Sequence, residues 1–249
     1  MLQVFKRPES LKDVPFRFCP GCGHSIVHRL VAECIDELGI RERTIGIAPV
    51  GCAVFAYDYF NFDVIECAHG RPPAVATALK RVMPDNVVFS YQGDGDLASI
   101  GLAEIVHAAN RGENLSVFFI NNATYGMTGG QMAPTTLVGQ KTTTTPSGRD
   151  PERQGHPLGI AEMLATIEDV VLVARTAIDG AKGIKETRRL IRKSFQYQID
   201  GRGFSMIEIL SPCPTVWRKD PVESLNWISA HMKPVFRTGL IIDRYGESQ

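Results

Sequence analysis

The sequence lacks the features that mark secreted, membrane-embedded or nucleic-acid-binding proteins. Its 249 residues carry 27 basic and 27 acidic side chains, so the formal net charge is zero, and no basic block stands out. Without an electropositive patch there is no support for nucleic-acid binding. No apolar stretch approaches membrane-spanning length, and the start of the chain, MLQVFKRPESLKDVPF, lacks the apolar run of a signal peptide. We therefore expect a cytoplasmic protein with no membrane partner.

Cysteine is scarce, and six cysteines in a chain of 249 residues do not resemble a secreted disulfide framework. Cys34 and Cys67 fall inside expected regular elements, and Cys34 lies on the apolar stripe of a helix, which indicates core packing. The other four lie in turns rich in glycine and proline: Cys19, Cys22, Cys52 and Cys213. Such a set could bind Zn²⁺ or a [4Fe–4S] cluster, and the first two could form a redox disulfide. Spacing alone does not choose among these.

Most of the chain alternates short apolar runs with segments of helical periodicity. This pattern predicts strands at 44–48, 64–68, 87–91, 115–120, 170–174 and 204–210, and helices at 25–38, 73–82, 97–110, 159–167 and 181–198. The alternation is typical of a single α/β domain with a mostly parallel sheet and helices on both faces. We place that domain at 19–215, an N-terminal arm at 1–18, and an irregular C-terminal tail at 216–249 with a short helix near 222–230. The threonine-rich segment 132–155 is expected to be a lid or a subunit contact.

The segment from Val87 to Gln131 organises the chain and reads as strand, tight turn, helix, strand and loop. A right-handed crossover makes the two strands parallel, so both end at the same edge of the sheet. Asp94 follows the first strand and Asn122 follows the second, at the edge where open α/β sheets bind ligands. Two oxygen ligands at this edge suit a Mg²⁺ ion that carries a diphosphate.

Two other interpretations of the turn stay open. The spacing Gly93-x-Gly95-x-x-Ala98 also fits a dinucleotide-binding turn. Against it, Asp94 would place a carboxylate beside a pyrophosphate, and the second strand ends in two asparagines with no acid to hold a ribose. The plain alternative is an ordinary turn between a strand and a helix.

Several of these motifs resemble one protein family. GDGD followed by NN is similar to the thiamine diphosphate motif, and TYGMTGGQ resembles the β subunits of 2-oxoacid:ferredoxin oxidoreductases of the 2-oxoisovalerate or 2-oxoglutarate type. The family's β subunits also carry CPGCGH near the N-terminus, a GC turn after the next strand, HGR and a late Cys-Pro. The resemblance covers roughly residues 16–215, with the motifs in the same order.

The resemblance implies where the cofactors are held. Mg²⁺ would be bound by Asp94, Asn122 and the backbone carbonyl of Thr124. A [4Fe–4S] cluster would be bound by Cys19, Cys22, Cys52 and Cys213. The cofactor would be lined by Val50, Gly51, Cys52, Ala53, His69, Gly95, Asp96, Gly126 and Met127. Catalytic contacts would come from His69, Arg71, Met127 and Thr128, whereas His24 is expected to be structural.

The resemblance also implies an activity, namely oxidative decarboxylation of a 2-oxoacid to acyl-CoA and CO₂, with electrons passing through the cluster to ferredoxin. A single α/β domain leaves no place for the glutamate that activates thiamine, so an α subunit should supply it, with small γ and δ subunits as further candidates. Some relatives have lysine where Gly129 stands here, which favours a branched-chain 2-oxoacid over 2-oxoglutarate. The competing classes are a non-redox thiamine decarboxylase or synthase, and a zinc-stabilised binding module.

Overall fold

The structure is a computed structural model that describes residues 6–246, and it contains one seven-stranded sheet with the order β2-β1-β3-β4-β6-β5-β7. Strands β1 to β6 pair in parallel, and β7 runs antiparallel to β5. The expected α/β fold with a mostly parallel sheet is therefore confirmed. Across the described residues, every helix is too short or too polar to span a lipid bilayer.

The strands have the following bounds: β1 Thr44–Ala48, β2 Asp63–Glu66, β3 Val87–Gly93, β4 Ser116–Asn121, β5 Val170–Ala177, β6 Phe204–Leu210 and β7 Gly239–Asp243. The α-helices are α1 His24–Leu38, α2 Ala56–Tyr59, α3 Pro72–Val82, α4 Leu102–Asn110, α5 Pro151–Gln154, α6 Ile160–Ala165, α7 Ala181–Ile199, α8 Pro214–Trp217, α9 Pro221–Trp227 and α10 Lys233–Val235. Shorter 3₁₀ or π segments are η1 Arg41–Arg43, η2 Cys52–Phe55, η3 Asp96–Ile100 and η4 Ile228–Met232.

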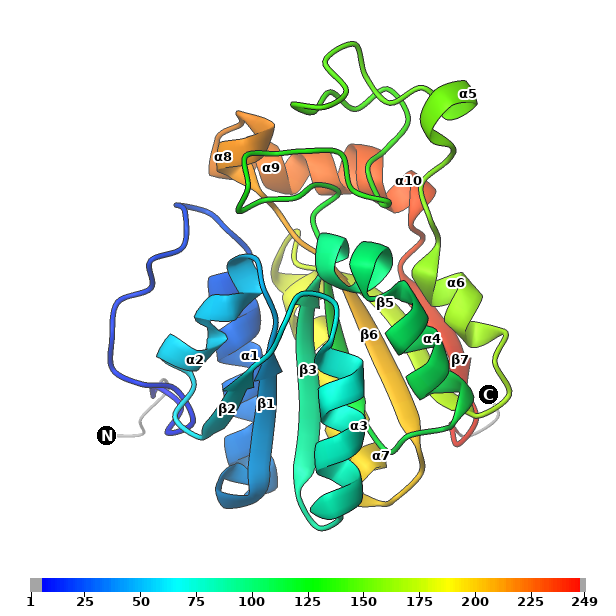
Figure 1. Cartoon of the computed structure of the whole chain (residues 1–249). Coiled ribbons are helices and arrows are strands. Elements are labelled where there is room, and N and C mark those ends of the chain that lie inside the picture. The colour runs from blue at the N-terminus through cyan, green and yellow to red at the C-terminus, as the bar shows by residue number, and fades with distance from the viewer. Residues whose placement is uncertain (1–5, 247–249) are drawn as a thin grey trace.

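Helices cover both faces of the sheet, with α3, α4 and α6 on one side and α1 and α7 on the other (Figure 1). Residues of β4 alternate between the two cores, because successive side chains of a strand point to opposite faces. Phe118 packs in the core under α1 and α7, with Phe195. Val117 and Phe119 pack in the core under α3 and α4, with Ile105. Burial on both faces explains why the central strands are continuous apolar runs.

The helix expected at 97–110 is interrupted near its start. A π-helical turn, η3, precedes α4, and the N–H of Gly101 donates to the carbonyl of Asp96 at 2.9 Å. The turn after β2 lies directly on this break, since a Cβ atom at Gly70 would lie 2.7 Å from the backbone nitrogen of Gly101. The π turn, a feature frequent at functional sites, brings the loop after β2 into contact with the segment that carries Asp96.

After β6 the chain crosses the carboxyl edge of the sheet and then returns to the sheet as strand β7. Helices α8 to α10 lie across this edge together with the long loop that follows β4 (Figure 1). Strand β7 then pairs with β5. The segment expected to be an irregular tail therefore contains helices and an edge strand. Sequence periodicity does not reveal β7, because it is short and its first residues, Gly239 and Leu240, are exposed.

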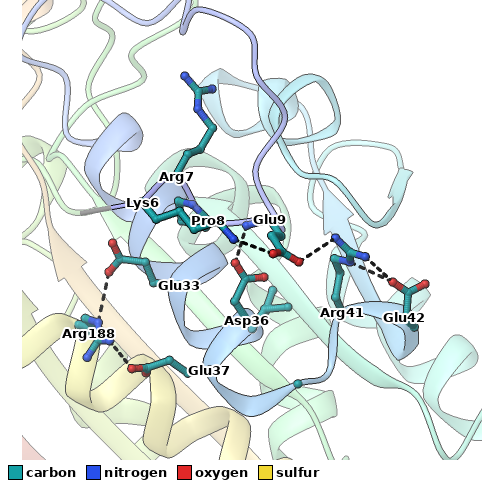
Figure 2. A pocket seen from close by; sticks show the side chains of 12 residues that line it. Lys6, Arg7, Pro8, Glu9, Glu33, Asp36, Glu37, Arg41, Glu42 and Arg188 are labelled. Atoms are coloured by element: carbon teal, nitrogen blue, oxygen red, sulfur yellow. Dashed lines mark hydrogen bonds and ion pairs between the residues drawn. The ribbon is translucent and has the colours of Figure 1, made fainter. Parts of the chain in front are cut away.

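The described part of the N-terminal arm, residues 6–18, is hydrogen-bonded to the end of α1. The Asp36 carboxylate accepts hydrogen bonds from the backbone and the hydroxyl of Ser10, at 3.0 and 2.5 Å. A hollow of about 500 Å³ lies beside this junction, close to the amino end of β1. Figure 2 shows the side chains that line it. Its charged side chains pair with one another: Glu9 with Arg41, and Arg188 with Glu33 and Glu37. Since this end of β1 is opposite the carboxyl edge, the hollow lies apart from the site described next.

Candidate functional site

A pocket of about 160 Å³ opens at the carboxyl edge of the sheet. Its walls come from the loops that follow β1, β2, β3 and β4, and from the start of α1. Parallel strands end at one edge, so neighbouring strands bring these loops together. The lining residues are His24, Val50, Gly51, Cys52, Ala53, His69, Gly93, Asp94, Gly95, Asp96, Asn122, Thr124, Tyr125, Gly126, Met127 and Thr128. The structure thus gathers all the residues that the family resemblance implied for the cofactor lining.

Asp94 lies at the centre of this edge and is buried. Its carboxylate accepts hydrogen bonds from the N–H of Gly95 at 3.0 Å, the N–H of Thr124 at 3.0 Å and the hydroxyl of Thr135 at 2.8 Å. All three donors are neutral, and burial raises the pKa of Asp94 to about 7. A buried carboxylate that is paired only with neutral groups fits a site that receives a cation.

The loop after β4 folds back onto Asp94. The N–H of Thr124 donates to the Asn122 side-chain oxygen at 3.3 Å as well as to Asp94. The indole N–H of Trp217, in α8, donates to the Asn122 carbonyl at 3.1 Å. Asp94, Asn122 and Thr124 are all buried and belong to one hydrogen-bonded cluster. Carboxylate, amide and carbonyl oxygens are the ligands that Mg²⁺ prefers.

A second buried carboxylate, Asp96, holds the imidazole of His69. Asp96 Oδ1 lies 2.6 Å from His69 Nδ1 and accepts from the N–H of Gly70 at 2.7 Å. Gln92 donates to the other oxygen at 2.6 Å. Burial raises the pKa of Asp96 against these hydrogen bonds. The arrangement fixes the ring through Nδ1 and leaves Nε2 available to a ligand in the pocket.

The glycine at 95 allows one wall of the pocket to form. A Cβ atom at Gly95 would lie 2.1 Å from Cε1 of Tyr125, so no larger residue fits while the Tyr125 ring occupies this position. Gly126 follows Tyr125 in the loop after β4 and faces two cysteines. A Cβ atom at Gly126 would lie 3.5 Å from Cys52 Sγ and 3.7 Å from Cys213 Sγ. The loop that carries the oxygen cluster therefore also touches two of the four turn cysteines.

The N-terminal cysteine turn docks onto the end of β6. The N–H of Gly23 donates to the carbonyl of Pro212 at 3.3 Å. A Cβ atom at Gly23 would lie 2.2 Å from the hydroxyl oxygen of Ser211, so the close approach requires glycine. This contact brings Cys19 and Cys22 next to Cys213, although most of the sequence separates them.

The four turn cysteines share one environment. All six cysteines are free thiols. Burial raises the pKa of Cys22 to about 12 and also raises the pKa of Cys52 and of Cys213. The charges of neighbouring members of the set also raise these pKa values. Cys19 and Cys52 act on Cys22, Cys19 acts on Cys52, and Cys22 and Cys52 act on Cys213.

The backbone N–H groups of His24 and Val216 act against burial and lower the pKa of Cys22 and of Cys213, respectively. Cys34 instead donates its thiol hydrogen to the carbonyl of Arg188 at 3.4 Å. Backbone donors aimed at sulfur favour the thiolate, which is the form that ligates metal. Within residues 6–246, no three His, Cys, Asp or Glu side chains converge closely enough to hold a single metal ion.

Of the residues assigned catalytic contacts, Arg71 lies outside the pocket lining and Thr128 lies within it. Arg71 is outside the pocket lining: its guanidinium pairs with Glu104 and donates to the carbonyl of Ile100 at 3.2 Å. Thr128 lines the pocket, and its hydroxyl donates to the side-chain oxygen of Gln131 at 2.6 Å.

The structure adds residues that sequence reasoning did not select. His24, expected to be structural, lines the pocket, and its Nδ1 lies 2.8 Å from the hydroxyl of Tyr91. Burial lowers the pKa of His24 to about 3, so its imidazole is neutral near pH 7. Thr135 and Tyr125 join the site through contacts with Asp94 and Gly95. His24 and Tyr125 belong to the motifs CPGCGH and TYGMTGGQ, which could have pointed to them, whereas no local sequence signal marks Thr135.

Comparisons with known proteins agree with this geometry. A family model described as thiamine pyrophosphate enzyme, C-terminal TPP binding domain, matches residues 49–209. The ketoisovalerate oxidoreductase subunit VorA of Methanothermobacter thermautotrophicus is 48% identical, over 99% of this chain and 54% of the relative. The 2-oxoglutarate synthase subunit KorB of Methanocaldococcus jannaschii is 35% identical, over 82% of this chain and 72% of the relative. The chain spans about half the length of the VorA relatives.

A solved structure has the same fold. The 2-oxoglutarate:ferredoxin oxidoreductase from Magnetococcus marinus, solved with 2-oxoglutarate, coenzyme A and succinyl-CoA bound, superposes with a TM-score of 0.79. The superposition covers 99% of this chain and 87% of that chain, at 26% sequence identity.

Proposed function

Because the chain belongs to the family of 2-oxoacid:ferredoxin oxidoreductase subunits with a thiamine diphosphate-binding domain, we propose that it forms the thiamine-binding half of such an enzyme. The activity is oxidative decarboxylation of a branched-chain 2-oxoacid to acyl-CoA and CO₂, with electrons delivered to ferredoxin. One observation carries the proposal: the loop that bears Asn122 and Thr124 touches Asp94 on one side and two turn cysteines on the other.

The oxygen cluster is the proposed Mg²⁺ and diphosphate site. Asp94, Asn122 and the carbonyl of Thr124 would hold the ion, and the neutral surroundings of Asp94 support this assignment. Thiamine diphosphate, when bound, supplies a nucleophile for the 2-oxo carbon and an electron sink. Gly93 lines the pocket with open space at the position of a Cβ atom, so the phosphates could approach the backbone closely there.

His69 is the proposed group that exchanges a proton with substrate. Asp96 fixes its Nδ1 at 2.6 Å, which leaves Nε2 for the ligand. The apolar side chains of Val50, Ala53 and Met127 line the same pocket and would exclude water from the reacting atoms. Arg71 would reach substrate only after it leaves its ion pair with Glu104.

The turn cysteines Cys19, Cys22, Cys52 and Cys213 are the proposed ligands of a [4Fe–4S] cluster. Tetrahedral zinc holds sulfurs about 3.8 Å apart, given a Zn–S distance of about 2.3 Å. A four-iron cluster is larger and takes four thiolates that surround it without meeting at one point. The meeting of the turns that carry these cysteines supports the cluster. A Cβ atom at Gly126 would lie 3.5 Å from Cys52 Sγ and 3.7 Å from Cys213 Sγ, and Gly23, next to Cys22, bonds Pro212, next to Cys213.

The substrate proposal rests on two observations. Gly129 leaves no cation after Thr128 to hold a second carboxylate. The relatives named for ketoisovalerate are 48% and 46% identical, whereas those named for 2-oxoglutarate are 32% to 35% identical. Both favour a branched, monoanionic 2-oxoacid.

The test is a kinetic comparison of 2-oxoacids with the assembled complex. The chain is co-expressed with its partner subunits and purified without oxygen, and viologen reduction is followed in the presence of coenzyme A. We expect the highest kcat/KM for branched-chain 2-oxoacids and a brown, iron-containing protein. Release of CO₂ without dye reduction would instead identify a non-redox decarboxylase. A colourless zinc protein without turnover would identify a binding module.

A further inference from the structure

A row of buried polar side chains runs through the sheet behind the proposed Mg²⁺ site. Arg175 of β5, Glu208 of β6 and Asn121 of β4 form this row, called the polar row below. Arg175 Nε donates to Glu208 Oε2 at 2.8 Å, and Asn121 Nδ2 donates to Glu208 Oε1 at 2.7 Å. The side chains of Arg175 and Glu208 are 0% and 1% exposed, and Asn121 is fully buried. Both oxygens of Glu208 are therefore used, one by each neighbouring strand.

The row ends on the loop that bears the proposed metal ligands. The side-chain oxygen of Asn121 accepts the N–H of Ala123 at 3.0 Å. Ala123 has φ +57°, a left-handed conformation that is unfavourable for residues other than glycine. Its carbonyl accepts the hydroxyl of Thr136 at 2.7 Å and the amide of Gln140 at 3.2 Å. Ala123 lies between Asn122 and Thr124, so its backbone conformation sets the directions of both.

The orientation of Asn121 depends on Glu208. An asparagine side chain can rotate to exchange its oxygen and its NH₂ group. The Glu208 carboxylate accepts only, so it fixes the NH₂ group toward itself and turns the Asn121 oxygen toward Ala123. Arg175 in turn holds the carboxylate in place, and its other end bonds Glu162 and the carbonyl of Arg237.

A buried ion pair is a weak source of stability, because desolvation of its charges offsets their attraction. It does impose one geometry on the groups that it contacts. The Arg175–Glu208 pair is fully desolvated and leads through Asn121 to the strained backbone at Ala123. Its role is therefore better explained as fixing the position of that loop than as stabilising the sheet.

We propose that Arg175, Glu208 and Asn121 are positioning residues for the Mg²⁺ site, which hold Ala123 in its left-handed conformation and thereby aim Asn122 and the Thr124 carbonyl at the ion. The proposal rests on the proposed function, since it assumes that Asp94, Asn122 and Thr124 bind Mg²⁺. It adds residues that never touch the ion or the cofactor.

The central variant is Glu208→Gln, which preserves shape but must present an NH₂ group to one of two donors, Asn121 Nδ2 or Arg175 Nε. The matched control is Gln198→Ala. Gln198 is buried and bonds Val88 and Ser116, which lie at the amino ends of β3 and β4, opposite the carboxyl edge that carries the site. A second control, Glu162→Gln, weakens the outer ion pair of Arg175 and leaves Asn121 untouched.

The measurement is calorimetric binding of thiamine diphosphate at a series of Mg²⁺ concentrations, with the full complex stripped of cofactor. Tm is recorded for each variant without cofactor. We expect Glu208→Gln to raise the Mg²⁺ concentration for half-maximal binding about tenfold, the effect of one charge-assisted hydrogen bond. Asn121→Ala should do the same and serves if Glu208→Gln does not fold. Gln198→Ala should lower Tm without changing the Mg²⁺ requirement, and Glu162→Gln should change it less than twofold.

The outcomes separate the positioning role from the metal site itself. Equal Mg²⁺ requirements in Glu208→Gln, Asn121→Ala and Gln198→Ala would show that the polar row only stabilises the sheet, and would overturn the proposal. An Asp94→Asn variant is measured in parallel. If it binds the cofactor as well as the unmodified chain does, the metal site is misassigned and the proposed function fails first. Loss of binding there, with no effect of the row variants, rejects the positioning role alone.

Discussion

Asp94 is the residue whose replacement tests the metal site most directly. Among the three proposed Mg²⁺ ligands it alone carries a negative charge, and it is buried with neutral hydrogen-bond partners. Without it, the charge of a bound diphosphate would be poorly compensated. We predict that Asp94→Ala abolishes Mg²⁺-dependent binding of thiamine diphosphate. Calorimetry checks this, and unchanged affinity would remove Asp94 from the site.

The same carboxyl group predicts a pH dependence. Burial raises its pKa from 3.8 to about 7, so between about pH 4 and pH 7 the folded chain keeps a proton that the unfolded chain has released. Without metal, its contribution to stability therefore falls as the pH rises through that window. Mg²⁺ binding requires the carboxylate, so below pH 7 it should release one proton, and the affinity should rise with pH and level off above 7. Calorimetry at pH 6 in buffers of different ionisation enthalpy measures the proton. Asp94→Asn, as the control, should release none.

The cysteines give a second residue-scale prediction. Cys52 lines the pocket in the turn after β1, close enough to Cys19 to be affected by its charge, whereas Cys34 is fully buried in α1 and donates to a carbonyl. We predict that Cys52→Ser loses the cluster and that Cys34→Ser keeps it. Iron and sulfide analysis of both variants, purified without oxygen, decides the matter. Equal iron content in the two would show that the ligand set is misassigned.

Individual site residues could be predicted from the sequence where a motif and the strand order together determine their position. Asp94 and Asn122 directly follow adjacent parallel strands, so their meeting could be predicted from topology. Thr135 could not be predicted, because it reaches Asp94 through the long loop, and His24 was within the CPGCGH motif but was expected to be structural. Arg71 shows the converse: its motif suggests the site, but an ion pair with Glu104 directs its side chain elsewhere.

The loops at the carboxyl edge depend on close packing between elements. A Cβ atom at Gly95 would lie 2.1 Å from the ring of Tyr125, so Gly95→Ala must displace that ring from the pocket wall. We predict that Gly95→Ala weakens thiamine diphosphate binding at least tenfold and lowers stability by about 1–3 kcal/mol, as overpacking does. The double variant Gly95→Ala with Tyr125→Ala should regain stability relative to Gly95→Ala. Denaturant unfolding and calorimetry measure both effects, and wild-type affinity in Gly95→Ala would contradict the packing argument.

Helices and strands could be predicted where the residues of the element itself carry the signal. The strands of the central sheet carry continuous apolar runs, and α1 ends at Gly39, which adopts φ +62° as a helix-terminating glycine should. The π turn before α4 was not predictable, since it depends on the contact between Gly70 and Gly101. Strand β7 likewise forms only through pairing with β5, because its own residues are few and partly exposed.

At the scale of the whole molecule, the pocket at the carboxyl edge is small and has an exposed apolar rim. The pocket measures about 160 Å³, below the roughly 300–1,000 Å³ of usual ligand pockets. Val50 and Met127 at its rim are both 44% exposed, which is unusual for apolar side chains that line a reaction site. A second subunit that covers this rim would enclose the cofactor and supply the activating glutamate.

We therefore predict that the chain alone does not turn over 2-oxoacids and that activity appears only with an α subunit. The acids nearest the site in sequence, Glu66 in β2 and Glu104 in α4, are held in regular elements, and Glu104 pairs with Arg71. An interface around a shared cofactor should bury about 2,000 Å² or more. The assay is dye reduction by the single chain with Mg²⁺, thiamine diphosphate and coenzyme A. Turnover equal to that of the complex would refute the shared site.

The contact between Gly23 and Pro212 has a consequence for how the protein is made. Three of the four proposed cluster ligands precede β2 in the sequence, and the fourth, Cys213, is made only after β6. An iron–sulfur donor that met the nascent chain would find an incomplete set of thiolates until β6 had been added to the sheet. A cluster on these four ligands would therefore be inserted only after β6 has joined the sheet, and it would link the N-terminal cysteine turn to the segment that follows β6.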